Sequence, residues 1–572
     1  MKALVLVKQV PDTKEIKTDE KTGSLQRDTV GSVLNEADKD ALIMCRNLKE
    51  QGKIVFDSMT LGPVQSRAAL RQALGYGAEN AYHICDGDFA GSDVLATAKT
   101  LKSAIENKDL NYKIIFAGFK SSDSDTGHLP AELSAILDYT YLTGVTEITD
   151  IDENFITVVS LSDNKKIYQK AKLPVVISVN QNNFPPEFPN LRQMMLARKK
   201  PLQKITNEDL MIEKDKCGYL GSPTKFVKMR AAISSREIEF LDDFNPEKDI
   251  PKFLKLAQKE VKSDKRQLFS TDKPQKVLVI ADKDELSVSK EMASSLLLKP
   301  ECLDLTLVTN SEKVDNLINY FDEIIVADKA VSYDQMSEFS MKLIEKENFD
   351  IVLCSSNDFG RSTAATIAAK LETGLTADCT EFEFFDNQFI MTRPAYDNRL
   401  LASIKIPDNL PQMATVRPDV FEVCELEKKA KIKKSNAEII ESKIQILREE
   451  KTDINRKTKK DILFVVGNII SSKEEVEYFK KLADKYNADL GCTRPVVTGQ
   501  LMNSDEQIGV SGHISDADLV VLVGVSGTTQ TMTGVKRCGK IIAINNDPNA
   551  EVFNHSDYGI VDDYKTVFRK DE

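Results

Sequence analysis

The stretch GVSGTTQTMTG, residues Gly524–Gly534, lies between two apolar runs, LVVLV (Leu519–Val523) and KIIAINNDP (Lys540–Pro548). Apolar runs without alternation are typical of strands buried on both faces of a parallel sheet. The loop between them is rich in glycine, hydroxyl and amide groups, which suit a helix start that approaches a phosphate closely. The stretch therefore predicts a ligand loop at the carboxyl edge of an α/β sheet.

Three other segments open in the same way and indicate more than one such sheet. They are KALVLV (Lys2–Val7), KVLVIA (Lys276–Ala281) and DILFVVGN (Asp461–Asn468). Between the strands, Val94–Glu106 and Glu474–Tyr486 carry apolar residues at helical spacing. The pattern predicts an α/β fold of three doubly wound, nucleotide-binding-like units.

Two of these units share a sequence pattern. Ile114–Ile148 and Ile351–Phe382 follow the same order of strand, polar loop and helix, and end on Thr-Glu and an apolar residue. The matching positions are Leu137, Thr146 and Glu147 in the first segment, and Leu371, Thr380 and Glu381 in the second. A pseudo-duplication is the economical explanation, although αβ units also resemble one another by construction.

Length and composition exclude several classes of protein. A chain of 572 residues at roughly 150 residues per domain predicts three or four domains. With 77 Lys+Arg against 89 Asp+Glu, a nucleic-acid binder is not expected. No apolar run reaches the ~18 residues of a membrane span, and MKALVLVKQV lacks a leader cleavage site. We expect a cytoplasmic protein without a membrane span.

Cysteine and histidine are scattered. Nine cysteines form no CxxC pair and four histidines form no cluster, so we expect core thiols, no metal site and no catalytic triad. Two charged stretches, Phe240–Gln267 and Lys428–Lys460, look like connectors. The second is either a solvated surface arm or a tether that lets the last domain reorient.

From Gly491 to Asp563, the loops GCTRPVVTGQ, QIGVSGH, GVSGTTQTMTG and AINNDPNAEVFNHSDYGIVDD follow one another, with strands between them. This pattern resembles the flavin domain of the electron transfer flavoprotein α subunit. TGLTADCTEF (Thr373–Phe382) and PQMATVRPDVF (Pro411–Phe421) resemble that subunit's first domain.

The amino-terminal part resembles the β subunit of the same family. The resemblance is carried by KQVPDT (Lys8–Thr13), LNEADKDAL (Leu34–Leu42), ALGYGAENA (Ala73–Ala81) and FPNLRQMMLARKKPL (Phe188–Leu202). It implies fused β and α subunits in one chain. The implied domains are a β-like domain at 1–240, a linker or arm at 241–275, an α amino-terminal-like domain at 276–435 and an FAD-binding, Rossmann-like domain at 436–572.

The resemblance also implies the residues of the flavin site. Arg494 matches the family's flavin-contacting arginine, a fixed cation suited to a flavin that becomes anionic on reduction. A surface arginine is the plainer alternative. Thr531 stands where the family usually has a histidine, and it cannot carry positive charge. The implied FAD contacts are Thr493, Arg494, Gln507, Ser511, Gly512, Ser526, Gly527, Gln530, Thr531, Asn545 and Asp563.

The β-like part implies a second nucleotide, which is AMP in simple carriers and a second FAD in the electron-bifurcating group. DGDFAGSDVLATAKTL (Asp86–Leu101) resembles the bifurcating pattern, whereas Gly118–Glu132 follows the family's loop only loosely. Asp123 and Asp125 are alternatively simple helix caps. The implied contacts are Lys8, Asn35, Gly62, Asp93, Thr97, Asp123, Asp125 and Thr126.

Two further stretches have a functional and a structural interpretation. Phe188 matches an apolar anchor of the family's partner-recognition loop, or else belongs to a buried hairpin with solvated basic residues. GRSTAATIAAK (Gly360–Lys370) opens a helix that holds phosphate through Arg361 and Ser362, or is only a capped structural helix, which is our default.

The resemblance implies an electron carrier without a small-molecule reaction of its own. It would take electrons from flavoprotein dehydrogenases, such as those of fatty acid oxidation, and pass them to a quinone oxidoreductase or another acceptor. NADH would be a donor if a second FAD is bound. We expect a monomeric pseudo-heterodimer and leave a higher oligomer open. The alternative is an NAD(P)-binding oxidoreductase or transhydrogenase-like enzyme.

Overall fold

The computed structural model describes most of the chain. The described residues are 1–12, 31–107, 110–162, 165–181, 183–185, 187–231, 236, 238–260, 271, 273–284, 286–296, 298–385, 388–396, 400–418, 420–435, 439–451, 460–503, 506–509, 512, 515, 517–528, 531–532, 534–535 and 538–568. Among these residues, no helix has the length and apolar character needed to cross a membrane.

Close contacts divide the chain into two compact units. The first unit holds residues 1–230, 268–396 and 400–452, and the second holds 231–267, 397–399 and 453–572. The first unit thus contains two of the predicted sheets. The proposed four-segment division of the chain stays a prediction.

The first half of unit 1 is built on a sheet whose parallel core has the order β11-β5-β4-β1-β6-β10-β7. Antiparallel β8, β9 and β24 extend it at the β7 edge. The strands are β1 (Lys2–Leu6), β4 (Val55–Leu61), β5 (Ala81–Ile84), β6 (Ile114–Gly118), β7 (Thr140–Ile151), β8 (Phe155–Ser162), β9 (Lys165–Lys172), β10 (Val175–Val179), β11 (Gln203–Ile205) and β24 (Ile444–Lys451).

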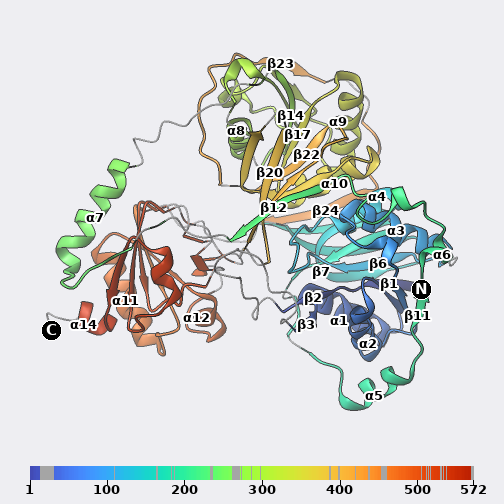
Figure 1. Cartoon of the computed structure of the whole chain (residues 1–572), viewed down its shortest axis with the longest axis horizontal. Coiled ribbons are helices and arrows are strands. Elements are labelled where there is room, and N and C mark those ends of the chain that lie inside the picture. The colour runs from blue at the N-terminus through green and yellow to red at the C-terminus, as the bar shows by residue number, and fades with distance from the viewer. Residues whose placement is uncertain are drawn as a thin grey trace. The chain divides into compact units, whose positions relative to one another are not determined.

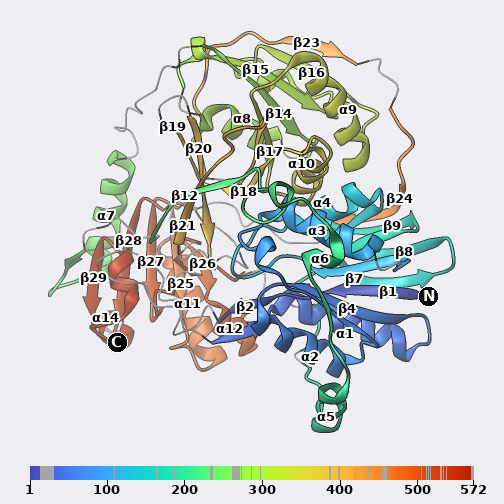
Figure 2. The ribbon, with the colours of Figure 1, turned by 45° about the vertical axis from the view of Figure 1, so that its right-hand side comes forward.

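Helices cover both faces of this sheet. α1 (Glu36–Glu50) and α2 (Arg67–Tyr76) lie on one face, and α3 (Val94–Asn107) and α4 (Leu129–Leu137) lie on the other (Figures 1 and 2). Neighbouring residues of β1 serve different cores, since Val5 packs with the α1–α2 side and Leu4 with the α3–α4 side. Burial on both faces explains the unbroken apolar runs of the sequence.

The second half of unit 1 repeats this arrangement. Its sheet has the order β23-β16-β15-β14-β17-β22-β18, which matches the first sheet strand for strand. The predicted pseudo-duplication is therefore confirmed. The strands are β14 (Gln275–Ala281), β15 (Leu303–Thr309), β16 (Glu323–Val326), β17 (Ile351–Ser355), β18 (Leu375–Cys379), β22 (Gln412–Val416) and β23 (Lys431–Lys434).

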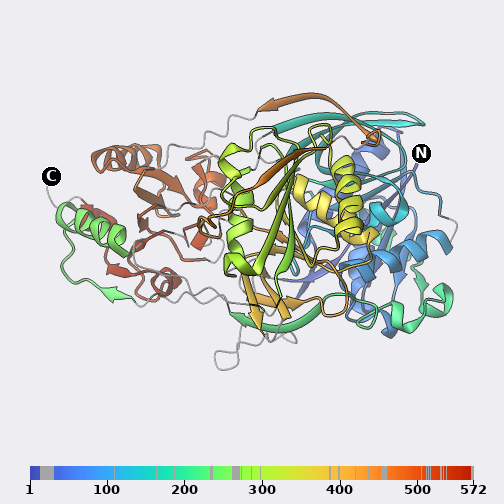
Figure 3. The ribbon, with the colours of Figure 1, turned by 90° about the horizontal axis from the view of Figure 1, so that it is seen from above.

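The two halves share one hydrophobic core. α4 of the first half packs against α10 (Asp358–Lys370) of the second, and residues of α3 and of α9 (Tyr333–Glu347) belong to the same core. Figure 3 shows the yellow helices of the second half beside the blue helices of the first. The rings of Tyr141 and Tyr333 pack edge to face at this junction. The halves also exchange strands, because β12 (Lys225–Ala231) joins the small sheet of β21 (Leu400–Lys405), β20 (Gln388–Ala395) and β19 (Glu381–Phe385).

Unit 2 contains the third parallel sheet, with the order β13-β29-β28-β27-β25-β26. α7 packs its buried Ile250, Phe253 and Ala257 against this unit, so part of the expected linker belongs to it. The strands are β13 (Glu239–Phe240), β25 (Ile462–Val466), β26 (Asp489–Cys492), β27 (Leu519–Val523), β28 (Lys540–Asn545) and β29 (Tyr558–Val561); the helices are α7 (Pro246–Glu260), α11 (Lys473–Lys485), α12 (Arg494–Thr498) and α14 (Tyr564–Phe568).

Candidate nucleotide sites

A cavity of about 1030 Å³ opens in unit 1 beside the ends of β1 and β6. In the first sheet β4 lies on one side of β1 and β6 on the other, so the chain reverses its direction of winding between these two strands. Open α/β sheets bind ligands where the winding reverses, because the loops that follow the two strands part there. The cavity therefore occupies the position that the fold favours for a ligand.

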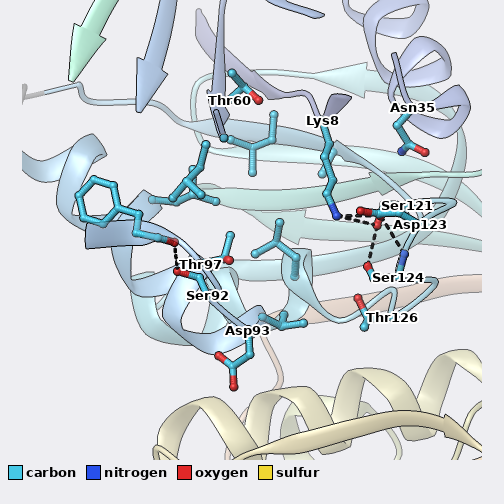
Figure 4. Close-up of a pocket in the computed structure, with 18 of the residues that line it drawn as sticks. Lys8, Asn35, Thr60, Ser92, Asp93, Thr97, Ser121, Asp123, Ser124 and Thr126 are labelled. Carbon is cyan, nitrogen blue, oxygen red and sulfur yellow. Dashed lines mark hydrogen bonds and ion pairs between the residues drawn. The ribbon is translucent and has the colours of Figure 1, made fainter. Parts of the chain in front are cut away.

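One wall of the cavity is a network of polar groups around Lys8. The Lys8 ammonium lies 2.8 Å from Asp123 Oδ1 and donates to Ser121 Oγ at 3.4 Å. The backbone N–H of Ser124 donates to the same Asp123 oxygen at 2.8 Å. Figure 4 shows the Lys8 side chain pointing toward Ser121 and Asp123, with Ser124 and Thr126 beside them.

The start of α1 is held tightly against this wall. Asp38 accepts hydrogen bonds from the backbone N–H of Lys8 at 2.7 Å and from that of Gly118 at 3.2 Å. A Cβ atom on Gly118 would lie 2.4 Å from an Asp38 oxygen, so only glycine allows this approach. Asn35 donates to the Lys120 carbonyl at 2.9 Å. Burial raises the pKa of Asp38 to about 7 against the opposing effect of these hydrogen bonds.

The start of α3 forms another wall. Asp93 accepts a hydrogen bond from the Ala96 N–H at 2.9 Å and two more from Thr224, from its N–H at 3.0 Å and its hydroxyl at 2.7 Å. Thr97 lies one turn further along the helix and also lines the cavity. Figure 4 shows Asp93 and Thr97 across the cavity from Lys8.

The second half of unit 1 also lines this cavity. Arg393 of β20 donates from Nε to the Ala377 carbonyl at 2.7 Å and from Nη1 to the Ser124 carbonyl. Thr376 of β18 lines the same region. The sequence did not single out either residue, because they lie far along the chain from the other lining residues. Only the shared core brings them there.

Several buried polar atoms of the cavity wall have no hydrogen-bond partner among the described residues. Buried polar atoms are usually satisfied, so such a group facing a cavity indicates where a ligand binds. These atoms are Thr60 Oγ1, Glu132 Oε2, Thr376 Oγ1 and Arg393 Nη2. The wall therefore offers hydroxyl, carboxyl and guanidinium groups to a polar ligand.

The residues predicted for the second nucleotide converge here, with one exception. Asp125 does not line the cavity; it is buried, has φ +50°, and lies 3.0 Å from the Lys120 ammonium. Its role as a nucleotide contact stays a prediction, as does that of the others. The lining residues are Lys8, Asn35, Gly62, Asp93, Thr97, Asp123 and Thr126.

In unit 2 the winding reverses between β25 and β27. A Cβ atom on Gly467, just after β25, would lie 1.9 Å from the Gly524 carbonyl oxygen. Gly524 itself has φ +59° and turns the chain away after β27. Backbone that comes this close leaves room for a ligand phosphate at the strand ends.

Several of the predicted flavin residues lie in loops that follow strands of this sheet. Arg494 is exposed at the first position of α12, and no described residue receives a hydrogen bond or ion pair from its side chain. Ser526 and Thr528 are exposed in the loop after β27. Gly527 has φ +87°, and a Cβ atom there would lie 2.0 Å from the Val552 nitrogen. A free cation and exposed hydroxyls beside a tight glycine turn fit the pyrophosphate and ring of FAD.

The remaining predicted flavin residues occupy neighbouring strand ends. Gln507 is bridged to Cys492, the last residue of β26, and a Cβ atom on Gly512 would lie 2.2 Å from the Gln507 carbonyl oxygen. Asn545 ends β28 and donates to the Val525 carbonyl at 3.0 Å. The other described members are Thr493, Thr531 and Asp563, whereas Ser511 and Gln530 lie outside the described residues.

The start of α10 has the features of a structural helix. Asn357 caps it by accepting the Gly360 N–H at 2.6 Å, and Ser362 donates to the Asp358 carbonyl at 2.7 Å. Arg361 lies 3.7 Å from Asp378. These contacts favour the capped-helix interpretation over phosphate binding.

Two family models match the chain. The electron transfer flavoprotein domain matches residues 22–210 and 307–443, and the electron transfer flavoprotein FAD-binding domain matches 457–536. The first match falls on both halves of unit 1, in agreement with their common strand order. The second covers the predicted flavin loops up to residue 536, but not Asn545 or Asp563, and favours FAD over the NAD(P) alternative.

Curated relatives agree with these matches. The electron transfer flavoprotein subunit beta of Thermoanaerobacterium thermosaccharolyticum is 37% identical over 230 residues, which are 40% of this chain and 86% of the relative. The subunit alpha of the same organism is 36% identical over 222 residues, 37% of this chain and 67% of the relative.

A third relative is the LctC subunit of lactate dehydrogenase (NAD(+),ferredoxin) of Acetobacterium woodii. It is 31% identical over 279 residues, which are 45% of this chain and 65% of that protein. Together with the three sheets and the loops at their carboxyl edges, these matches show that the chain belongs to the electron transfer flavoprotein family, with β-like and α-like parts fused in one polypeptide.

Proposed function

We propose that this chain is an electron carrier of the two-flavin type, with one FAD in unit 2 and a second FAD in the cavity of unit 1. The observation that carries the second flavin is the size of the cavity. Sites for small ligands span roughly 300–1,000 Å³, and the cavity, at about 1030 Å³, is slightly larger than that range. FAD has more than twice the atoms of AMP, so a cavity of this size favours FAD.

The chemistry of the cavity walls supports the same assignment. Lys8 and the loop from Ser121 to Thr126 offer donors for phosphate groups at one end. Apolar residues line the part of the cavity near α3, α4 and β18, where a ring system would be shielded from water; they include Leu95, Leu101, Leu129 and Leu375. A ligand with phosphates and an extended ring system suits both regions.

In unit 2, Arg494, Ser526 and the glycine turn at Gly527 would hold the FAD. When bound, FAD supplies one- and two-electron redox chemistry, which no amino-acid side chain of this site supplies. The fixed charge of Arg494 favours negative charge on a neighbouring group. Ser526 and Thr528 offer hydroxyl donors, and the backbone turn allows close approach of the pyrophosphate.

We further propose that the α5 region docks flavoprotein dehydrogenases. α5 (Leu191–Lys199) and the preceding loop expose Phe188 at 70% and Leu191 at 79% of their surface. Met195 and Leu196 are also exposed, and Arg192, Arg198 and Lys199 frame the patch. An exposed aromatic anchor within a cationic rim suits an acidic partner surface with an apolar pocket.

The name of the LctC relative links that protein to NAD(+) and ferredoxin. On this basis we propose NADH as a donor to the flavin of the unit 1 cavity. Acyl-CoA dehydrogenases and a quinone-reducing oxidoreductase are the partners that the family resemblance implies for the flavin of unit 2.

The test is to denature the purified chain and to quantify the released FAD and AMP per polypeptide. We expect two FAD and no AMP. One FAD and one AMP would overturn the two-flavin proposal and leave a simple carrier. A colourless protein that binds no added FAD would overturn the carrier proposal altogether.

A further inference from the structure

Glu132 is a buried acid with a carboxyl oxygen that receives no hydrogen bond from the described residues of unit 1. It lies in the first turn of α4, only 2% of its surface is exposed, and it lines the cavity. Its backbone N–H donates to the His128 carbonyl at 2.9 Å, but Oε2 has no hydrogen-bond partner among the described residues. The side chain therefore does not serve as a cap or as a structural ion pair there.

Charged groups from several elements face the same cavity. Asp93 at the start of α3 already accepts three hydrogen bonds, so its oxygens are occupied. Lys8 is paired with Asp123, and Arg393 donates to two backbone carbonyls. Burial, with a smaller contribution from Asp93, raises the pKa of Glu132 well above its usual range. A neutral carboxyl group carries an O–H donor that a carboxylate lacks.

The position of Glu132 indicates which part of a ligand it would meet. Leu129 of the same helix turn, Leu95 of α3 and Leu375 of β18 also line the cavity. The phosphate end of a nucleotide favours cations and backbone N–H groups, such as those around Lys8. A neutral donor on an apolar wall instead suits an uncharged acceptor on a ring.

We propose that Glu132 determines recognition of the nucleotide's ring system, by donating a hydrogen bond from its carboxyl group to a ring nitrogen or ring carbonyl oxygen. The inference rests on the nucleotide occupancy of the cavity proposed above. It assigns Glu132 a role in ligand selection, because a ligand without an acceptor at that point would leave the carboxyl group buried and unpaired.

Two substitutions separate recognition from a structural role. Glu132→Gln keeps a neutral donor of similar shape, whereas Glu132→Met fills the same volume without a donor. Replacing an unpartnered buried polar group by an apolar one does not destabilise the unliganded fold. We therefore expect Glu132→Met to melt at the wild-type temperature or above while it binds nucleotide more weakly. Glu106→Met, at an exposed position of α3, is the matched control.

The experiment titrates AMP and FAD, in separate arms, into the full-length chain after its nucleotides have been removed, and records stoichiometry, affinity and melting temperature. For the cavity site, we expect the dissociation constant of Glu132→Gln to stay within about threefold of the wild-type value. Glu132→Met should raise the dissociation constant about tenfold, because one hydrogen bond to the nucleotide is lost. Weakening in both arms would place the acceptor on adenine, and weakening for FAD alone would place it on the flavin ring.

The other outcomes are distinct. If the wild-type cavity binds neither AMP nor FAD, so that FAD binds only once per chain, the proposed function of unit 1 fails. If the cavity binds nucleotide and Glu132→Met binds it as tightly as wild type, the inference about Glu132 fails alone. If Glu132→Met loses binding together with a fall in melting temperature in the absence of nucleotide, the role of Glu132 is structural and the inference is again overturned.

Discussion

The two halves of unit 1 have the same strand order but use the ends of their central strands differently. Strand pairing aligns Ala3 of β1 with Val277 of β14. Ala3 pairs with Ile114, the first residue of β6, and Val277 pairs with Ile351, the first residue of the equivalent strand β17. By the same count, Asp282 occupies the position of Lys8. Lys8 lines the cavity of the first half with a positive charge, whereas Asp282 brings a negative charge to the equivalent position of the second half.

In the second half, the loop after β17 is short and makes close contacts with its own helix and with β18. A Cβ atom on Gly360 would lie 2.1 Å from the Ser355 carbonyl oxygen, and Asn357 accepts the Gly360 N–H. Ser356 donates to Asp378 at 2.8 Å, and Arg417 also donates to Asp378. The two halves thus share a strand order, but the side chains and the contacts of the loops after their central strands differ.

The largest effect on stability is expected at Asp378, a buried residue of β18 in the second half. Although burial opposes ionisation, Arg417 and Arg361 hold the pKa of Asp378 well below its usual range. Asp378→Ala should lower the free energy of unfolding by about 3–5 kcal/mol, because two guanidinium groups lose a buried partner. Urea denaturation at pH 7 measures this. A loss under about 1 kcal/mol would mean that Asp378 does not stabilise the second half.

His128 should give the next largest effect, and it depends on pH. Burial, together with Arg361 and Arg393, lowers the pKa of His128 to about 3. Below pH ~6.5 the unfolded chain binds a proton that the folded chain does not, so stability falls as the pH falls toward 3. This contribution reaches up to about 1.4 kcal/mol per pH unit.

His128→Gln should remove this pH-dependent loss of stability. Urea denaturation of wild type and variant between pH 7 and pH 4 gives the two slopes, and the variant should lose stability less steeply. Parallel slopes would show that His128 is protonated in the folded protein or accessible to water.

A pair of helix caps, one in each half of unit 1, compares the two halves directly. Asn357 accepts the Gly360 N–H at the start of α10, and Asp93 accepts the Ala96 N–H at the start of α3. Alanine at either position should cost about 0.5–2 kcal/mol. Only Asp93→Ala should also reduce the nucleotide bound in the cavity, measured as nucleotide per chain. Equal nucleotide content in both variants would remove Asp93 from the site.

The smallest effect on stability is expected for Lys8→Asp, which gives the first half the charge found at the equivalent position of the second. The Lys8–Asp123 pair is partly exposed, so its loss should cost under about 1 kcal/mol. Bound nucleotide should nevertheless fall sharply, because a carboxylate repels phosphate. Lys39→Asp, at a half-buried position of α1 that does not line the cavity, is the control. Undiminished nucleotide in Lys8→Asp would show that Lys8 does not meet the phosphates.

Much of the fold could be predicted because its strands are buried on both faces. Unbroken apolar runs such as Leu519–Val523 identify themselves without reference to the rest of the chain. The turn around Gly524 could also be predicted from the sequence, since two backbone segments approach this closely only at glycine. α7 was taken for part of a linker, because its charged sequence does not reveal that Phe253 is buried in unit 2.

The sequence by itself determined the class of fold, the repeated order of elements and the loops that follow the central strands, because these depend on local periodicity and on glycine. Only the tertiary structure decided that a cavity opens beside β1 and β6 and which residues from the other half line it. Arg393, Thr376 and Glu132 line one cavity only because the two halves share one core. Packing between distant segments leaves no periodic trace in the sequence, so a buried acid without a partner becomes visible only once its surroundings are known.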